Sequence, residues 1–138
     1  MDPATDEYGR YVVLKGKAFS VVCAVQANGK SPCKDSLEQL AHKQKAVFLT
    51  LRGMLEAAAD YCAFHDLGYI KREKTDLYAF ILKREKYRVP FFRDGQSLVL
   101  THGFFKDGQK WPPEEFARAE RIMAEDRSRV ALRRGTPK

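Results

Sequence analysis

The sequence predicts a single α+β domain in which helices pack on one side of a mainly antiparallel sheet. Hydrophobic residues first recur at helical spacing and later form short strand-like runs, and turn signals separate these runs. A chain of 138 residues with 44% hydrophobic residues is long enough for one domain with a sizeable core. The expected domain occupies residues 17–126, between a flexible N-terminal lead-in (residues 1–16) and a basic C-terminal tail (residues 127–138).

The first predicted element is a strand within Lys17–Gln26, where three valines supply β-branched residues. Asn28 and Gly29 form a turn signal that ends it. A short helix follows, with Asp35 or Ser36 as its N-cap. A longer helix is predicted from about Lys43 to Asp60, because apolar residues recur there at helical spacing: Val47, Leu51, Met54, Leu55 and Ala58.

Three successive strands are predicted next, after a loop marked by Gly68 and the charged residues 71–74. They are expected at residues 77–82, 87–93 and 97–104, and the Asp94-Gly95 pair between the last two is a hairpin signal. Short links between successive strands are typical of an antiparallel meander. Pro112 and Pro113 then open a C-terminal helix, since proline is tolerated in a first helical turn.

The cysteines and the apolar segments exclude several classes of protein. Three cysteines without a C-x-x-C motif argue against a disulfide framework and a zinc site, and Cys23 and Cys62 are interpreted as core residues. No apolar run is long enough to cross a membrane. The acidic, polar N-terminus does not resemble a signal peptide, so a cytoplasmic protein is expected.

The positive charge is concentrated in the second half of the chain. Residues 1–76 carry 11 Lys/Arg and 10 Asp/Glu, a net charge of +1, whereas residues 77–138 carry 14 and 8, a net charge of +6. This distribution suggests a polyanionic partner such as RNA. A solvated basic surface without a partner is the alternative.

Two stretches of the sequence resemble a known family. Residues 27–32 (ANGKSP) and 37–40 (LEQL) are similar to the strand–turn–helix opening of HigB-type toxins, in the phage-derived branch of the RelE/ParE toxin superfamily. Residues 87–89 (YRV) resemble the family's central strand, which bears an arginine. Residues 100–106 (LTHGFFK), with Gln109, Lys110 and Pro112, resemble the strand end and helix start that follow it. The resemblance covers roughly residues 17–125.

The resemblance implies a RelE-like fold with the order strand, two helices, three-stranded antiparallel meander and C-terminal helix. It also implies a toxin of a type II toxin–antitoxin system, an endoribonuclease that cleaves mRNA, commonly on the ribosome, without a metal or other cofactor. Its expected partners are mRNA on the ribosome and a cognate HigA-like helix-turn-helix antitoxin.

Metal-free RNA cleavage uses the 2′-hydroxyl of the RNA as the nucleophile, so the protein must move protons and neutralise charge on the phosphate. Arg88, which matches the family's central arginine, is the predicted phosphate clamp; alternatively it is a surface arginine paired with Glu85 or Asp94. Lys106 could stabilise the phosphate or protonate the leaving oxygen, or be a solvated turn lysine.

His102 is a candidate general base because an ordinary histidine titrates near neutrality. His102 alternates along the predicted strand in step with Leu98, Leu100 and Phe104. This spacing places it on an apolar face, which also fits a histidine buried in the core.

Four further residues are candidate RNA contacts. Lys83 and Arg84 lie in a basic turn, although solvated charge is the default interpretation for such residues. Lys110 could contact the RNA backbone. Trp111 could stack on a base, or belong to the core or its rim.

One departure from the family pattern leaves the activity open. The family often has an aromatic-Glu-Leu-Arg stretch on the first meander strand, and residues 78–81 (YAFI) contain neither the Glu nor the Arg. The alternative function is therefore a non-cleaving relative that binds RNA or an antitoxin. A metal-dependent nuclease is less favoured, because no acidic cluster suited to Mg²⁺ lies among the basic strands.

Overall fold

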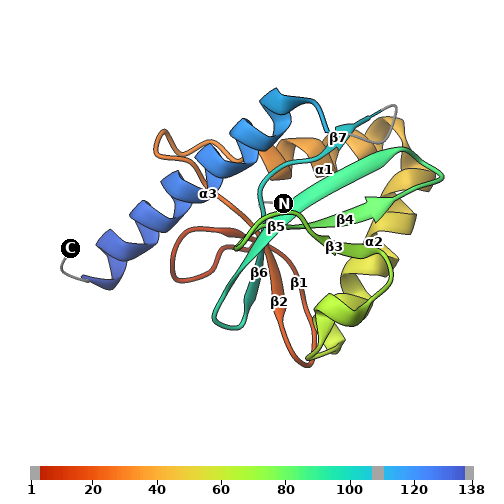
Figure 1. Cartoon of the computed structure of the whole chain (residues 1–138). Helices are drawn as coiled ribbons and strands as arrows, with labels where there is room; N and C mark the ends of the chain where they lie inside the picture. Colours follow the sequence, from red (N-terminus) through yellow and green to blue (C-terminus); the bar gives the residue numbers. More distant parts are fainter. Residues whose placement is uncertain (1–3, 107–110, 136–138) are drawn as a thin grey trace.

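The computed structural model describes residues 4–106 and 111–135 and shows a mixed α+β domain (Figure 1). Within these residues there are three α-helices, one 3₁₀ turn at Phe64–Asp66 and a seven-stranded sheet. The strands are β1 (Tyr11–Lys15), β2 (Ser20–Cys23), β3 (Ile70–Arg72), β4 (Tyr78–Leu82), β5 (Tyr87–Asp94), β6 (Ser97–Leu100) and β7 (Phe104–Phe105). The helices are α1 (Pro32–Lys43), α2 (Lys45–Asp60) and α3 (Pro113–Arg134).

The strand order is β1-β2-β6-β5-β4-β3, with β7 also paired to β5. The predicted meander is confirmed, because β4, β5 and β6 pair antiparallel in sequence order. Gly95, at a φ of 59°, sits in the β5–β6 hairpin, as the Asp94-Gly95 signal predicted. Only β2 and β6 pair in parallel, so the sheet is mainly antiparallel.

The helices cover both faces of the sheet, and the prediction of helices on one side is therefore wrong. Alternate residues of a strand point to opposite faces. Val21 and Cys23 accordingly join the core under α1 and α2, whereas Val22 and Ala24 pack with Ile122 of α3. The meander is thus held between two helical layers, with the helical hairpin on one face and the long C-terminal helix on the other (Figure 1).

The predicted N-terminal lead-in is not a structureless segment. Residues 11–15 form β1, which pairs antiparallel with β2, so the first strand of the fold was missed. Ser31, rather than Asp35 or Ser36, caps α1: its Oγ accepts from the Lys34 amide at 3.5 Å. β1 did have a local signal, because Tyr11, Val12 and Val13 favour strands, and the assignment of residues 1–16 to a lead-in overlooked it.

Two other boundaries differ from the prediction. β3 forms within the stretch that was assigned to a loop, where it pairs with β4. The last predicted meander strand divides into β6 and β7. The Thr101 amide still donates to the Pro90 carbonyl at 2.9 Å, but the ladder ends there because Pro90 has no N–H to return the bond. Gly103 lets the chain pass close to Tyr87, since a Cβ there would overlap the Tyr87 hydroxyl.

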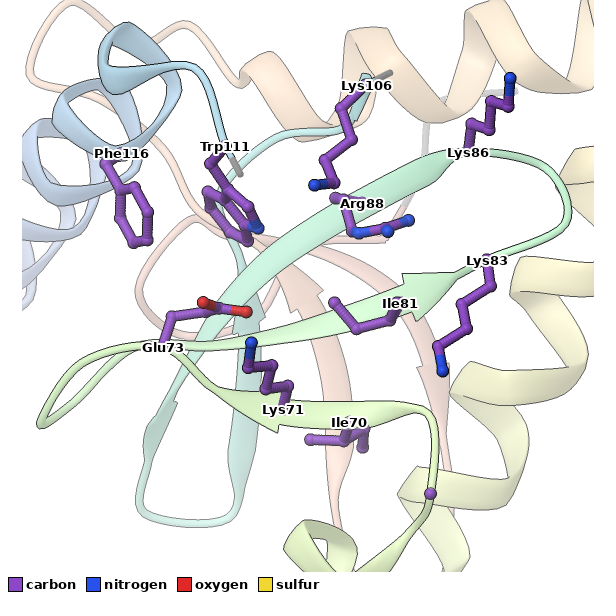
Figure 2. Close-up of a pocket in the computed structure, with 11 residues that line it drawn as sticks. Ile70, Lys71, Glu73, Ile81, Lys83, Lys86, Arg88, Lys106, Trp111 and Phe116 are labelled. Atoms are coloured by element: carbon purple, nitrogen blue, oxygen red, sulfur yellow. The ribbon is translucent and has the colours of Figure 1, made fainter. Parts of the chain in front are cut away.

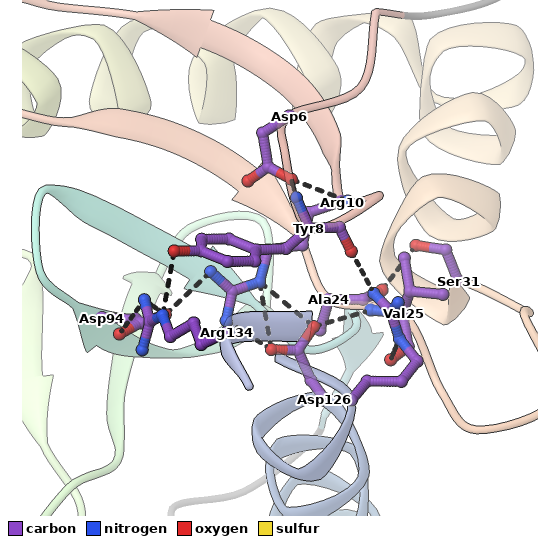
Figure 3. A network of polar contacts seen from close by, with 10 residues as sticks. Asp6, Tyr8, Arg10, Ala24, Val25, Ser31, Asp94, Asp126 and Arg134 are labelled. Atoms are coloured by element: carbon purple, nitrogen blue, oxygen red, sulfur yellow. Dashed lines mark hydrogen bonds and ion pairs between the residues drawn. The ribbon is translucent and has the colours of Figure 1, made fainter. Parts of the chain in front are cut away.

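The basic C-terminal segment is largely helical, so its assignment as a tail from residue 127 is wrong. α3 continues to Arg134 and ends at Gly135, which adopts the left-handed conformation typical of a helix terminus. Arg129 and Arg133 donate to the carbonyls of Tyr8 and Glu7, at 2.8 Å in each case. Arg134 donates to the Tyr8 hydroxyl at 2.9 Å (Figure 3), so part of the excess positive charge ties the N-terminal segment to α3.

The cysteines also differ in part from the prediction. Cys23 is buried as expected, but Cys62 is exposed just after α2. Cys33 is buried near Cys23, and burial raises the pKa of the Cys33 thiol, so Cys33 is a protonated, apolar residue of the core.

Candidate functional site

An open cleft of about 930 Å³ lies on the face of β3, β4 and β5 beside the start of α3 (Figure 2). Its charged lining consists of five cations and one carboxylate: Lys71, Lys83, Lys86, Arg88, Lys106 and Glu73. Apolar and aromatic residues complete it: Ile70, Ile81, Trp111 and Phe116, with Gly68 at the rim. A concave surface with this charge suits an anionic ligand.

β5 places Arg88 over the floor of the cleft. Tyr87 and Val89 point into the helical core, so alternation turns Arg88 to the opposite face, between Ile81 of β4 and Phe104 of β7. Its Nη1 donates to the backbone carbonyls of Tyr87 and Leu82 at 3.0 and 3.3 Å.

These two bonds orient the Arg88 guanidinium while leaving donors for a ligand. Within the described part of the chain, no hydrogen bond uses its Nε or Nη2. Arg88 is also not paired with Glu85 or Asp94, which was the alternative interpretation, because Asp94 binds Arg10 and Arg134 instead.

Lys106 is the most unusual cation of the cleft. The residue is only 6% exposed, and its Nζ is buried without a hydrogen-bond partner among the described residues. Burial lowers the pKa of Lys106, and the nearby positive charges of Arg88 and Lys71 lower it further, although Glu73 opposes the shift. A buried ammonium without a partner costs free energy, which a bound anion would recover.

Lys106 is held in place by its own backbone. Its amide donates to the Lys86 carbonyl at 2.8 Å, directly after the two-residue strand β7 has paired with β5. The ammonium and the Arg88 guanidinium consequently project into the cleft from neighbouring strands, close to each other (Figure 2). Burial also lowers the pKa of Arg88, while Glu73 raises it.

Glu73 provides the carboxylate of the cleft. It follows β3, in a turn closed by its amide donating to the Leu77 carbonyl at 2.8 Å. Its Oε2 is buried and has no hydrogen-bond partner among the described residues. Glu73 and Lys71 were not predicted as site residues, because residues 71–74 were expected to form a loop. Their spacing of two, next to the apolar Ile70, was the available signal for a strand with both side chains on one face.

An aromatic cluster forms one wall of the cleft. The Trp111 ring stacks on Phe116 at a centroid distance of 4.4 Å and meets Phe104 edge-on at 5.1 Å. These contacts fix the indole, which remains half-exposed at the cleft. Phe116, on the first turn of α3, supports this wall.

The structure brings together four of the predicted site residues, Arg88, Lys106, Lys83 and Trp111, in the one cleft. Arg84 is exposed and does not line it. Lys110 lies outside the described residues.

His102 lies in the core and not at the cleft. Its Nδ1 is 3.1 Å from the Thr101 hydroxyl and its Nε2 is 3.0 Å from Glu115 Oε1. Burial lowers the pKa of His102 to about 4, and Arg118 adds to the shift while Glu115 opposes it. The imidazole is fully buried, so its position does not support the predicted catalytic role and fits the alternative of a core histidine.

No helix in residues 4–106 and 111–135 is long and apolar enough to span a membrane. The same residues contain no group of three or more His, Cys, Asp or Glu side chains that could hold a metal ion.

The chain matches the model of a known protein family. No curated protein matches the chain. The family model of the phage-derived Gp49-like proteins (DUF891) matches residues 35–124, which is more than half of the chain and includes both Arg88 on β5 and Glu73 after β3. The chain therefore belongs to the phage-derived Gp49-like family, which is part of the RelE/HigB-like toxin superfamily.

Proposed function

We propose that this protein is a HigB-type toxin with a RelE-like fold, an endoribonuclease that cleaves mRNA without a metal. Its family membership supports a toxin-like role. The observation that carries the nuclease assignment is the buried ammonium of Lys106, which has no partner among the described residues, beside Arg88 in an open cationic cleft. A phosphodiester is a ligand that satisfies both groups, because it offers two anionic oxygens to a point charge and to a planar guanidinium.

The cations would accelerate cleavage by stabilising charge. Attack of the 2′-oxygen on phosphorus places additional negative charge on the phosphoryl oxygens, and preorganised donors favour this transition state over the ground state. Arg88 is already oriented by two backbone carbonyls, so little reorganisation is needed during the reaction. In this proposal Arg88 binds the phosphoryl oxygens and Lys83 contacts the flanking backbone.

Lys106 has a second role in this proposal, as the proton donor to the leaving oxygen. The 2′-hydroxyl loses its proton to water in the open cleft, the 2′-O–P bond forms and the P–O5′ bond breaks. The leaving 5′-oxygen takes a proton from the Lys106 ammonium, whose lowered pKa makes it a stronger acid than an ordinary lysine. The products are a 2′,3′-cyclic phosphate and a free 5′-hydroxyl.

The proposal includes two partners. The substrate is mRNA on the ribosome, where an extended single strand can enter an open cleft. A HigA-like helix-turn-helix antitoxin encoded next to this gene would bind and silence the protein. Co-purification of that neighbouring product with this chain tests the pairing separately from the nuclease activity.

A second candidate function is a relative that binds RNA or an antitoxin without cleavage. The observation that favours it is Ile81, an apolar residue directly opposite Arg88 in the β4–β5 register and on the cleft floor. It stands within the stretch where the family often carries Glu and Arg, so the cleft can bind a phosphate with fewer groups for the chemical step.

Induced expression of the wild type beside Arg88→Ala, with mRNA ends mapped in the same cultures, tests the proposal. We expect growth arrest and new mRNA ends from the wild type, and a cleavage rate about a hundredfold lower in the variant, which has lost one oriented donor. Arg93→Ala is the matched control, because Arg93 lies on the same strand but over Phe19 on the opposite face.

Full toxicity of Arg88→Ala would refute the site assignment. Normal growth and intact mRNA with folded, soluble wild-type protein would favour the non-cleaving alternative.

A further inference from the structure

The two ends of the cleft differ in chemistry. Lys106, Arg88 and Lys83 bring positive charge to its middle and to one end, as described above (Figure 2). The opposite end holds Glu73 facing the aromatic wall of Trp111 and Phe116, with the Lys71 side chain beside it (Figure 2). A carboxylate is not expected in a groove that binds only phosphates, because its negative charge weakens the binding of an anion.

The carboxylate of Glu73 has a free acceptor directed into the cleft. Oε2 is buried and unpartnered, and no ion pair joins Glu73 to any cation of the described chain. The turn that holds Glu73 is closed by the two amides of Glu73 and Lys74, which both donate to the Leu77 carbonyl. A fixed, buried acceptor without a donor costs free energy, so the site is incomplete until a ligand supplies N–H groups.

The aromatic wall offers the flat surface that a nucleobase needs. The stack on Phe116 and the edge contact with Phe104 hold the Trp111 indole in one orientation. Base-on-aromatic stacking is how proteins bind single-stranded RNA, and hydrogen bonds along the base edge then decide which base is held.

We propose that Glu73 and Trp111 form a nucleobase pocket that selects guanine next to the phosphate bound by Arg88 and Lys106. Among the four RNA bases, guanine presents two adjacent N–H donors, N1–H and N2–H, that match the two oxygens of one carboxylate. Adenine and cytosine place an acceptor beside their amino group, and the single N–H of uracil stands between two carbonyls. These acceptors would face the carboxylate unfavourably.

This inference rests on the proposed function for the phosphate contact, yet nucleotide binding tests it without cleavage. Trp111 is the single tryptophan of the chain, so its fluorescence reports directly on the pocket. The probes are the 3′-monophosphates of guanosine, adenosine, cytidine, uridine and inosine, titrated into the full-length wild-type protein. We expect guanosine 3′-monophosphate to bind about tenfold more tightly than the other three standard nucleotides. The affinity for inosine 3′-monophosphate, which lacks the N2 amine, should lie between the affinity for the guanosine nucleotide and those for the other three.

The variant Glu73→Gln should remove most of the preference, because an amide presents only one acceptor. Glu56→Gln is the matched control: Glu56 is exposed on α2 and does not line the cleft. Equal binding of all five nucleotides by the wild type, or no quenching by any, would overturn the inference. The inosine comparison uses the wild type alone, so it remains decisive even if Glu73→Gln does not fold.

Cleavage assays separate the failure of this inference from failure of the proposed function. RNA cut without preference for guanine beside the scissile bond would leave the nuclease intact and refute the pocket. Guanosine 3′-monophosphate binding without any cleavage would support the pocket and count against the nuclease. If Glu73→Gln slowed cleavage equally at every sequence while keeping the nucleotide preference, Glu73 would be a proton acceptor rather than the base-reading group, and the inference would be wrong.

Discussion

The guanidinium of Arg10 is bound by the carboxylate of Asp126, a residue 116 positions later in the sequence (Figure 3). Arg10 Nε lies 3.0 Å from Asp126 Oδ1, and both side chains are at most 1% exposed. Asp126 Oδ2 also accepts from the Val25 amide at 3.0 Å, and Arg10 donates to Asp94. One buried carboxylate thus joins the N-terminal segment, the end of β2 and α3.

We expect Asp126→Ala to destabilise the protein by about 3–5 kcal/mol, because it leaves the Arg10 guanidinium and the Val25 amide buried without their acceptor. Urea denaturation followed by circular dichroism measures the change. The control is Glu120→Ala, which breaks an exposed pair with Lys74 and should cost no more than about 1 kcal/mol. Equal effects of the two variants would contradict the importance assigned to burial.

Lys106→Met should stabilise the fold by about 1 kcal/mol and abolish toxicity. Methionine has a similar length and removes a buried ammonium that has no partner among the described residues. Thermal unfolding and the growth assay measure the two effects on one variant. A destabilised Lys106→Met protein would indicate that the ammonium contributes to the fold rather than to a ligand site.

The pH dependence of stability should contain a contribution from His102. Burial holds the folded pKa at about 4, below the ordinary value of 6.5, so the unfolded chain binds the proton more readily. Stability from this group is therefore fully present above pH 6.5 and is lost as the pH falls toward 4. Between pH 7 and pH 5 the free energy of unfolding should decrease by about 2 kcal/mol because of this group.

The control for this pH effect is His102→Gln, which cannot titrate. Urea denaturation at both pH values should show a smaller decrease in this variant than in the wild type. The same decrease in both proteins would assign the pH effect to other groups.

Gly103→Ala should cost about 2 kcal/mol, because the added Cβ would overlap the Tyr87 hydroxyl and push β7 from β5. Lys106 follows β7 directly, so cleavage should decrease as well. Gly53→Ala is the matched control, since a Cβ there meets open space on α2 and alanine favours a helix, which should stabilise slightly. A fully active, stable Gly103→Ala protein would show that the Gly103–Tyr87 contact does not position Lys106.

The β5–β6 hairpin and the α2 stripe show what local sequence can predict. Asp94-Gly95 specifies a two-residue hairpin turn through its backbone preferences, and residues at helical spacing define one buried face without reference to the rest of the chain. Arg88 was found by resemblance, which identifies a position in a motif rather than a neighbour in space.

The sequence by itself determined the α+β class, the meander and the two-helix segment, because turn propensity and hydrophobic period act over a few residues. Only the tertiary structure decided that β3 forms, since one buried residue in three gives no alternating hydrophobic pattern and its hydrogen bonds depend on pairing with β4. It also decided that α3 covers the second face and that His102 is buried. The tertiary structure also placed Glu73 in one cleft with Lys106 and Trp111, because residues that are distant along the chain form a site only when the chain packs.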